Sequence, residues 1–106
     1  AEQQSEDRAS QSEIFGYARE AVLGVLQHQA EIDDELSTYA QGWSLTRMPA
    51  LDRAILRLAT WEILFNDEVP DAVAVDEAVE LAKDYSTDDS AGFINGLLNK
   101  ISATKA

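Results

Sequence analysis

The sequence predicts an all-α protein, a compact bundle of about five helices. Apolar residues recur at the three- and four-residue spacing of amphipathic helices along most of the chain. The only strand-like run, at residues 73–75, is too short and has no partner run with which to pair. The chain has 106 residues and 45% hydrophobic content, which suffices for the core of one small domain.

The N-terminal residues 1–13 are expected to form a mobile acidic arm. They carry almost no large apolar side chain, so burial cannot offset the entropy lost on ordering them. Helical periodicity starts at Ile14, with Ser12 as the expected N-cap. The residues that share the apolar face of this first helix are Phe15, Ala18, Val22 and Leu26, and Ile14, Ala21 and Val25 widen it. The helical domain then spans residues 14–102, followed by a short tail at 103–106.

The next two helices are predicted on either side of a connector. A short helix near Glu31 should end around Gly42, since glycine is the usual residue just past a helix end. Pro49 suits the first turn of a third helix, where its missing N–H is not needed. That helix is apolar around most of its circumference, which is typical of the buried centre of a bundle. Its polar residues are expected to mark a narrow solvent side: Asp52, Arg53, Arg57 and Thr60.

Two further helices complete the expected bundle. Pro70 opens the fourth, and residues 86–90 form a turn rich in capping residues before the fifth. The fifth helix contains Gly96, and a glycine inside a helix costs about 1 kcal/mol relative to alanine. We therefore expect that a neighbouring helix approaches closely at Gly96.

The charge balance argues against a free-standing nucleic-acid binder. The chain has 20 acidic and 8 basic residues, a net charge of −12, whereas phosphate binding depends on Lys and Arg. Taken alone, this composition favours a helical protein that binds other proteins. Without cysteine, disulfides and thiolate metal sites are excluded, and the single histidine, His28, argues against a histidine metal cluster or a catalytic triad. We expect no catalytic residues, no metal and no cofactor.

Targeting signals are not visible in the sequence. No apolar run approaches the roughly 20 residues that a membrane helix needs, and the first dozen residues are polar rather than signal-like. The expected location is the cytoplasm, without membrane contact.

The last third of the chain carries a specific pattern. Val69-Pro70 is followed by Glu77–Lys83, which reads EAVELAK, and by Asp89–Lys100, which reads DSAGFINGLLNK. This order resembles the C-terminal signature of the NusB family. Upstream, Trp43–Met48 and the DRAILRLATWEIL segment at Asp52–Leu64 are similar to two further family motifs, so the resemblance covers most of the chain.

The resemblance implies a non-enzymatic, cytoplasmic, RNA-binding transcription antitermination factor. Family members bind the boxA RNA of ribosomal RNA transcripts together with the ribosomal protein NusE, in an antitermination complex with RNA polymerase; a homodimer is left open. The resemblance places RNA contact at Asp89 and Phe93 and partner contact at Asp52. From the residues alone, Phe93 could equally be a core residue in one row with Leu97, and Asp89 could be a helix cap.

Two departures from the family pattern shape the expectation. Gly92 stands where many relatives have a lysine, and the family begins with an arginine-rich segment and two helices that have no counterpart before Ile14. We therefore expect a C-terminal fragment or a truncated homologue. Two alternatives remain: an acidic helical module that binds only protein, and the NusB-like domain of a ribosomal RNA cytosine methyltransferase. The latter tends to show Asn-Ala where this chain has Asn95-Gly96.

Overall fold

The computed structural model describes the backbone of residues 2–40 and 42–105 and the side chains of residues 11–40 and 42–105. Its helices are α1 (Glu2–Gln27), α2 (Gln29–Tyr39), α3 (Ala50–Phe65), α4 (Asp71–Tyr85) and α5 (Asp88–Ala103). Within these residues there is no strand, so the all-α class and the five helices are confirmed. None of these helices is long and apolar enough to cross a lipid bilayer.

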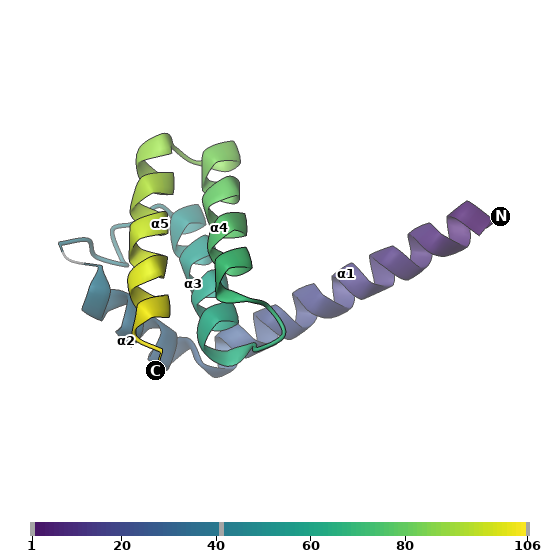
Figure 1. The fold of residues 1–106 in the computed structure, drawn as a ribbon, viewed down its shortest axis with the longest axis horizontal. Coiled ribbons are helices and arrows are strands. Elements are labelled where there is room, and N and C mark those ends of the chain that lie inside the picture. Colours follow the sequence, from purple (N-terminus) through teal and green to yellow (C-terminus); the bar gives the residue numbers. More distant parts are fainter. Residues whose placement is uncertain (1, 41, 106) are drawn as a thin grey trace.

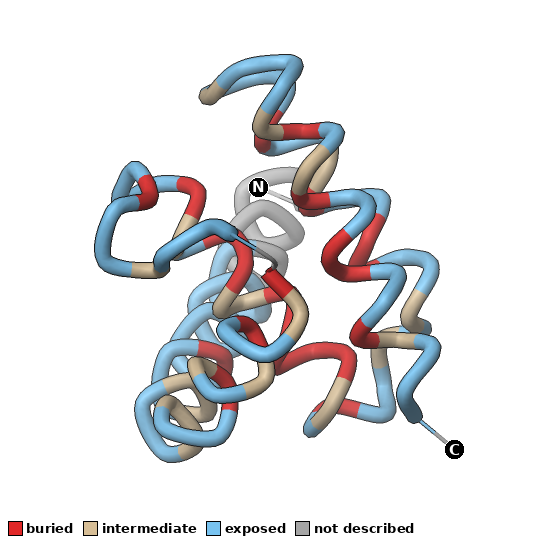
Figure 2. The backbone as a smooth tube through the Cα atoms, turned by 90° about the vertical axis from the view of Figure 1, so that its left-hand side faces the viewer, coloured by how far each residue is buried: buried red, intermediate tan, exposed pale blue. Residues whose placement is uncertain are grey.

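Helix α3 forms the centre of the bundle and contacts each of the other four helices. Its side chains Leu56 and Ile63 are fully buried. Helix α4 contributes the small buried residues Ala74 and Ala82, which let α5 lie close beside it (Figure 1). Figure 2 shows the buried positions recurring along the helices of the bundle. The expected central helix is therefore confirmed.

The predicted solvent side of α3 is only partly correct. Arg53 and Arg57 are half-buried, but Asp52 and Thr60 are buried. Because other helices surround α3, its polar side chains are covered along with its apolar ones. Conversely, Leu51 at the start of α3 is exposed.

Helix α1 starts earlier than its apolar periodicity indicates. It begins at Glu2, so Ser12 lies inside the helix and is not its N-cap. The N-terminal part of α1 extends away from the bundle (Figure 1). The radius of gyration is accordingly 14.9 Å, against the roughly 13 Å of a compact domain of about 100 residues. Whether residues 1–13 are mobile remains a prediction.

The apolar stripe predicted for α1 packs against the bundle only along one edge, where Ala21 is buried and Val25 packs against the core. Phe15 is 71% exposed, and Val22 and Leu26 are also exposed. Contact with the bundle comes through this edge and through Gly24 beside it. Gly24 lies against the indole of Trp61, so closely that a Cβ on Gly24 would overlap the ring nitrogen.

Polar and aromatic contacts also fasten α1 to α3. The Tyr17 hydroxyl donates a hydrogen bond to the buried Glu62 carboxylate, and Asn66 Nδ2 lies 3.5 Å from the same hydroxyl. Where α1 meets α2, the His28 ring stacks on Phe65 with centroids 4.0 Å apart. Burial raises the pKa of the Tyr17 hydroxyl above its ordinary value, and the adjacent Glu62 raises it further.

The helix ends follow the turn chemistry of the sequence. Gly42 adopts a φ of 85°, the left-handed conformation that glycine tolerates best, just after α2. Pro49 and Pro70 occupy the N-cap positions of α3 and α4, one residue before the first turn. Both prolines have extended backbone angles there, so the two helix starts are placed to within one residue by the sequence.

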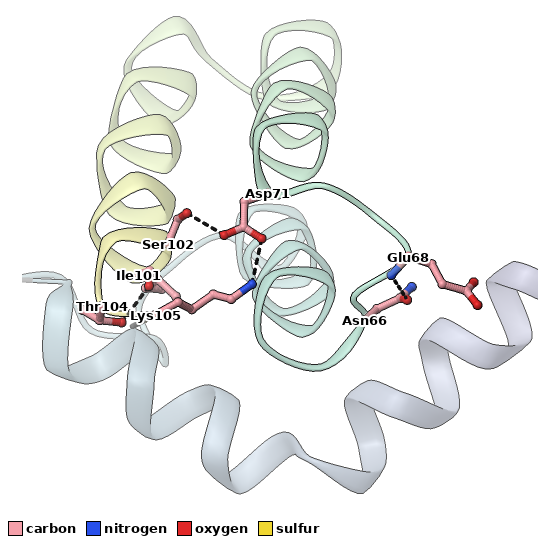
Figure 3. Close-up of polar contacts among 7 residues, drawn as sticks. All are labelled: Asn66, Glu68, Asp71, Ile101, Ser102, Thr104 and Lys105. Atoms are coloured by element: carbon pink, nitrogen blue, oxygen red, sulfur yellow. Dashed lines mark hydrogen bonds and ion pairs between the residues drawn. The ribbon is translucent and has the colours of Figure 1, made fainter.

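The C-terminal end of α5 is tied to the start of α4 (Figure 3). Asp71 accepts a hydrogen bond from the Ser102 hydroxyl at 2.7 Å and pairs with Lys105 Nζ at 3.0 Å. Burial raises the pKa of the Asp71 carboxyl, but the bonds from Ser102 and Lys105 outweigh it, so the pKa lies below its usual value. Part of the expected tail thus makes specific contacts.

The expectation of close approach at Gly96 is wrong within this chain. Gly96 is exposed, and a Cβ added to it would meet nothing within 4 Å. The helical glycine that permits close packing is instead Gly24.

Candidate nucleic-acid interface

The start of α5 carries two of the predicted contact residues. Thr87 is the N-cap, and its hydroxyl oxygen accepts a hydrogen bond from the Ser90 backbone N–H at 3.0 Å. Asp89 is therefore not the cap. It is an exposed residue of the first helical turn, where a carboxylate is favoured by the helix dipole. Phe93 follows at i+4, so the two side chains share one face of α5.

Phe93 is neither a core residue nor a free surface ring. It is half-buried, whereas Leu97 in the same row is buried. Its ring lies against Trp43 in the connector between α2 and α3, with centroids 4.6 Å apart and planes tilted by 33°. Trp43 itself is 56% exposed. The two rings form an aromatic pair at the edge of the bundle.

Asp52 lies beneath the turn that carries Asp89. It is 6% exposed, and its Oδ2 accepts a hydrogen bond from the Ser90 hydroxyl at 2.8 Å. Its Oδ1 is buried and has no hydrogen-bond partner. An acidic side chain at this position of a helix often accepts from the N-cap N–H, but the N-cap is Pro49, which has none. Asp52 thus joins the starts of α3 and α5; its direct contact with a partner stays a prediction.

A groove of about 600 Å³ lies beside the aromatic pair. Its lining comes from α2, the connector and α3, and includes Asp33, Trp43, Ser44, Thr46, Arg53 and Arg57. Arg57 forms a two-point ion pair with Asp33, with both N–O distances at 2.9 Å. Arg53 donates to the Leu45 carbonyl at 3.0 Å. Both guanidinium groups are therefore held in place at the groove.

The segment at residues 42–65, which supplies most of the groove lining, exposes no carboxylate, although Asp33 of α2 also lines the groove. Three of the eight basic residues, Arg47, Arg53 and Arg57, lie within residues 47–57. Between residues 42 and 65 the only acidic residues are Asp52 and Glu62, and both are buried. From the sequence, Arg53 and Arg57 were predicted on the solvent side of α3, and Trp43 was not predicted as a site residue. The sequence signal for this face is that residues 42–65 hold three arginines and only two acidic residues, both on the predicted central helix.

Comparison with known proteins identifies the relatives of this chain. The NusB family model matches residues 1–103. The chain belongs to the NusB family. The transcription antitermination protein NusB of Leifsonia xyli subsp. xyli is 66% identical over 89 residues, which are 84% of this chain and 62% of the relative. The NusB of Beutenbergia cavernae is 68% identical over 80% of this chain and 56% of the relative.

Solved structures give the same fold. A crystal form of T. maritima NusB superimposes with a TM-score of 0.79 at 43% identity, covering 84% of this chain and 63% of that one. A structure described as that of a plectonemic RNA supercoil has a TM-score of 0.78 at 28% identity, covering 87% and 69%. The chain thus spans roughly six-tenths of the length of these NusB relatives. The NusB-like fold expected from the sequence is confirmed.

Proposed function

We propose that this chain is part of a non-enzymatic transcription antitermination factor that binds the boxA RNA of ribosomal RNA transcripts. Family membership and the name shared by its relatives support the process. The proposed RNA contact is supported by one arrangement of residues at the start of α5. Asp89 and Phe93 share a face of α5, and Phe93 lies against Trp43, which lines a groove with two fixed arginines. The connector and α3 residues of this groove expose no carboxylate.

Each residue has a distinct proposed role. The Phe93 ring contributes to stacking on an unpaired base, and the Asp89 carboxylate accepts a hydrogen bond from the exocyclic amine of a base. Arginines of the groove face supply contacts to phosphate, which position the RNA without reading its sequence. Asp52 acts through Ser90, because that hydrogen bond fixes the turn on which Asp89 stands.

We further propose that the remaining surface serves a protein partner, the ribosomal protein NusE, within the antitermination complex of RNA polymerase. The net charge of −12 favours a partner with a complementary basic surface, since such complementarity speeds association and excludes wrong partners. Such a factor would act in the cytoplasm, where bacterial transcripts are made.

Fluorescence anisotropy of labelled RNA at low salt tests the RNA contact. The chain should bind boxA RNA more tightly than a scrambled RNA of the same composition, and more tightly still with NusE present. Phe93→Ala should reduce the binding free energy by roughly 1–3 kcal/mol. Phe15→Ala is the matched control, because that ring is exposed on α1, a helix that contributes no residue to the groove lining. Equal affinity for the two RNAs would remove the support for boxA recognition.

A thermal melt of the same Phe93→Ala variant distinguishes a loss of RNA contact from a loss of folding stability. A half-buried ring should contribute less to stability than the roughly 3–5 kcal/mol of a fully buried phenylalanine. A loss of that full size with unchanged RNA affinity would assign Phe93 to the core.

A second candidate function is a module that binds protein only. The net charge and the exposed apolar stripe of α1 favour it. It predicts that NusE binds the chain while boxA RNA does not bind either the chain or the complex at any salt concentration.

A further inference from the structure

Trp43 is the more exposed of the two rings in the aromatic pair. Its side chain is 56% exposed, whereas Phe93 is half-buried under the contact between the two rings. Because Trp43 lies against Phe93 with centroids 4.6 Å apart, it covers part of the surface that Phe93 would offer to a base. A ligand that reaches this site from solvent therefore meets the larger indole ring first.

The connector holds Trp43 in a fixed position. The Trp43 backbone N–H donates to the Ala40 carbonyl at 3.0 Å, and the Met48 backbone N–H donates to the Ser44 carbonyl at 3.1 Å. Met48 is buried, and the Arg53 guanidinium donates a hydrogen bond to the Leu45 carbonyl of the connector. A ring that is ordered before binding loses little entropy on contact with a ligand. The exposed indole is thus a preorganised surface and not a loose side chain.

The surroundings favour an anion over a basic partner. Trp43 lines the groove that contains Arg53 and the ion pair between Arg57 and Asp33. Arg47 lies four residues further along the connector, so Arg53 and Arg47 are the cations available to a phosphate. No carboxylate is exposed between residues 42 and 65. An aromatic ring beside fixed cations is the combination that single-stranded nucleic acids use, with the base on the ring and the phosphate at the cation.

We propose that Trp43 is a stacking platform for an unpaired RNA base, with Phe93 supporting the indole from its inner side. This inference rests on the proposed RNA binding and deepens it. It assigns the main base-stacking surface to the connector between α2 and α3, and gives Phe93 a supporting role.

The two tryptophans of the chain provide the test. Trp61 is buried, so its indole N–H signal in NMR spectra serves as an internal control. On titration with single-stranded boxA RNA at low salt, the Trp43 indole signal should shift and saturate with the same dissociation constant as the complex. The Trp61 signal should stay in place. Trp43→Phe assigns the two signals.

Variants measure the contribution of the ring. Trp43→Ala should weaken RNA binding by about tenfold or more, whereas Trp43→Phe keeps a stacking surface and should stay within about threefold of the parent. Phe15→Ala, which removes an exposed ring from α1, should leave RNA binding unchanged. A thermal melt of Trp43→Ala must show a folded domain, and Trp43→Phe provides the comparison if that variant unfolds.

Different outcomes identify which proposal fails. RNA binding by folded Trp43→Ala as tight as that of the parent would overturn the platform and leave the proposed function standing. If no signal of the parent shifts with RNA, the proposed function fails and the platform fails with it. A Trp43 signal that shifts with NusE but not with RNA would show that the ring contacts protein, which also contradicts the inference.

Discussion

Gly24 and Gly96 show how differently two helical glycines can act. Both lie inside helices, where glycine costs about 1 kcal/mol relative to alanine. At Gly24 the missing Cβ makes room for the indole of Trp61, whereas at Gly96 a Cβ would meet nothing within 4 Å. The sequence indicates that each glycine lowers helix stability and that some other advantage must offset this cost, but it does not show which side chain lies opposite each glycine. The neighbour comes from another helix and is far away in the chain.

A pair of alanine substitutions tests this difference. Gly24→Ala should destabilise the fold by roughly 1–3 kcal/mol, because the new methyl group overlaps the Trp61 ring and the packing must shift. Gly96→Ala should stabilise it by up to about 1 kcal/mol through helix propensity. Urea denaturation of the two variants beside the parent measures both changes. Equal effects at the two sites would refute the close approach at Gly24.

At the scale of elements, the attachment of α1 to α3 depends on a buried carboxyl group. Burial raises the pKa of Glu62 above its usual value, the nearby Glu77 adds to the increase, and the hydrogen bond from Tyr17 opposes it. A carboxyl with a raised pKa in the folded state binds its proton more tightly there than in the unfolded chain. Its contribution to stability is full below the unfolded pKa and is lost as pH rises through the folded pKa.

Glu62→Gln should therefore alter the pH dependence of stability. As pH rises from about 4.5, the usual carboxyl value, the parent should lose stability relative to the glutamine variant, and the difference should level off above the raised pKa. The glutamine oxygen can still accept the Tyr17 hydrogen bond. Chemical denaturation at a series of pH values from 4 to 8 measures the difference. A constant difference across this range would contradict the raised pKa.

Tyr17→Phe tests the same contact from the other helix. Removal of the hydroxyl leaves the buried carboxylate without this donor, so the variant should lose roughly 1–3 kcal/mol at neutral pH. The loss should shrink at low pH, where Glu62 is protonated. Because Tyr17 is the polar link between the two helices, amide exchange in α1 should also increase more than in α5. Uniform acceleration in both helices would indicate that the contact is not specific to α1.

Sequence patterns predicted the elements better than their neighbours. The order of the helices, the central place of α3 and the proline-marked starts of α3 and α4 follow from local rules of periodicity and capping. The exposed stripe of α1 and the buried Asp52 did not follow, since a period identifies an apolar or polar face but not what covers it. The same limit holds for the site. Phe93 was recognisable by resemblance, whereas its contact with Trp43 depends on a connector that returns from α2.

At the scale of the whole molecule, charge sets the strength of RNA binding. The net charge of −12 repels a polyanion, and the groove face offers few cations against it. Arg57 is already paired with Asp33, which leaves Arg47 and Arg53 as the main candidates for phosphate contact on this face. We therefore predict that this 106-residue chain binds boxA RNA weakly, and that an arginine-rich segment fused before residue 1 strengthens binding.

The dependence of affinity on salt tests this prediction without reference to absolute affinity. Each phosphate contact with a single strand contributes about −0.7 to the slope of log K against log salt, so two or three contacts give a slope of roughly −1.4 to −2.1. Arg47→Gln should make that slope shallower by about 0.7, because Arg47 is exposed and directly follows the connector residues that line the groove. Lys100→Gln removes the same charge from the last turn of α5 and should leave the slope unchanged, since net charge alone does not set it. The fused segment should steepen the slope in proportion to the phosphates it contacts. Tight binding by the unextended chain at physiological salt would contradict the predicted weak binding. Equal slopes for the two glutamine variants would show that RNA is held elsewhere than on the groove face.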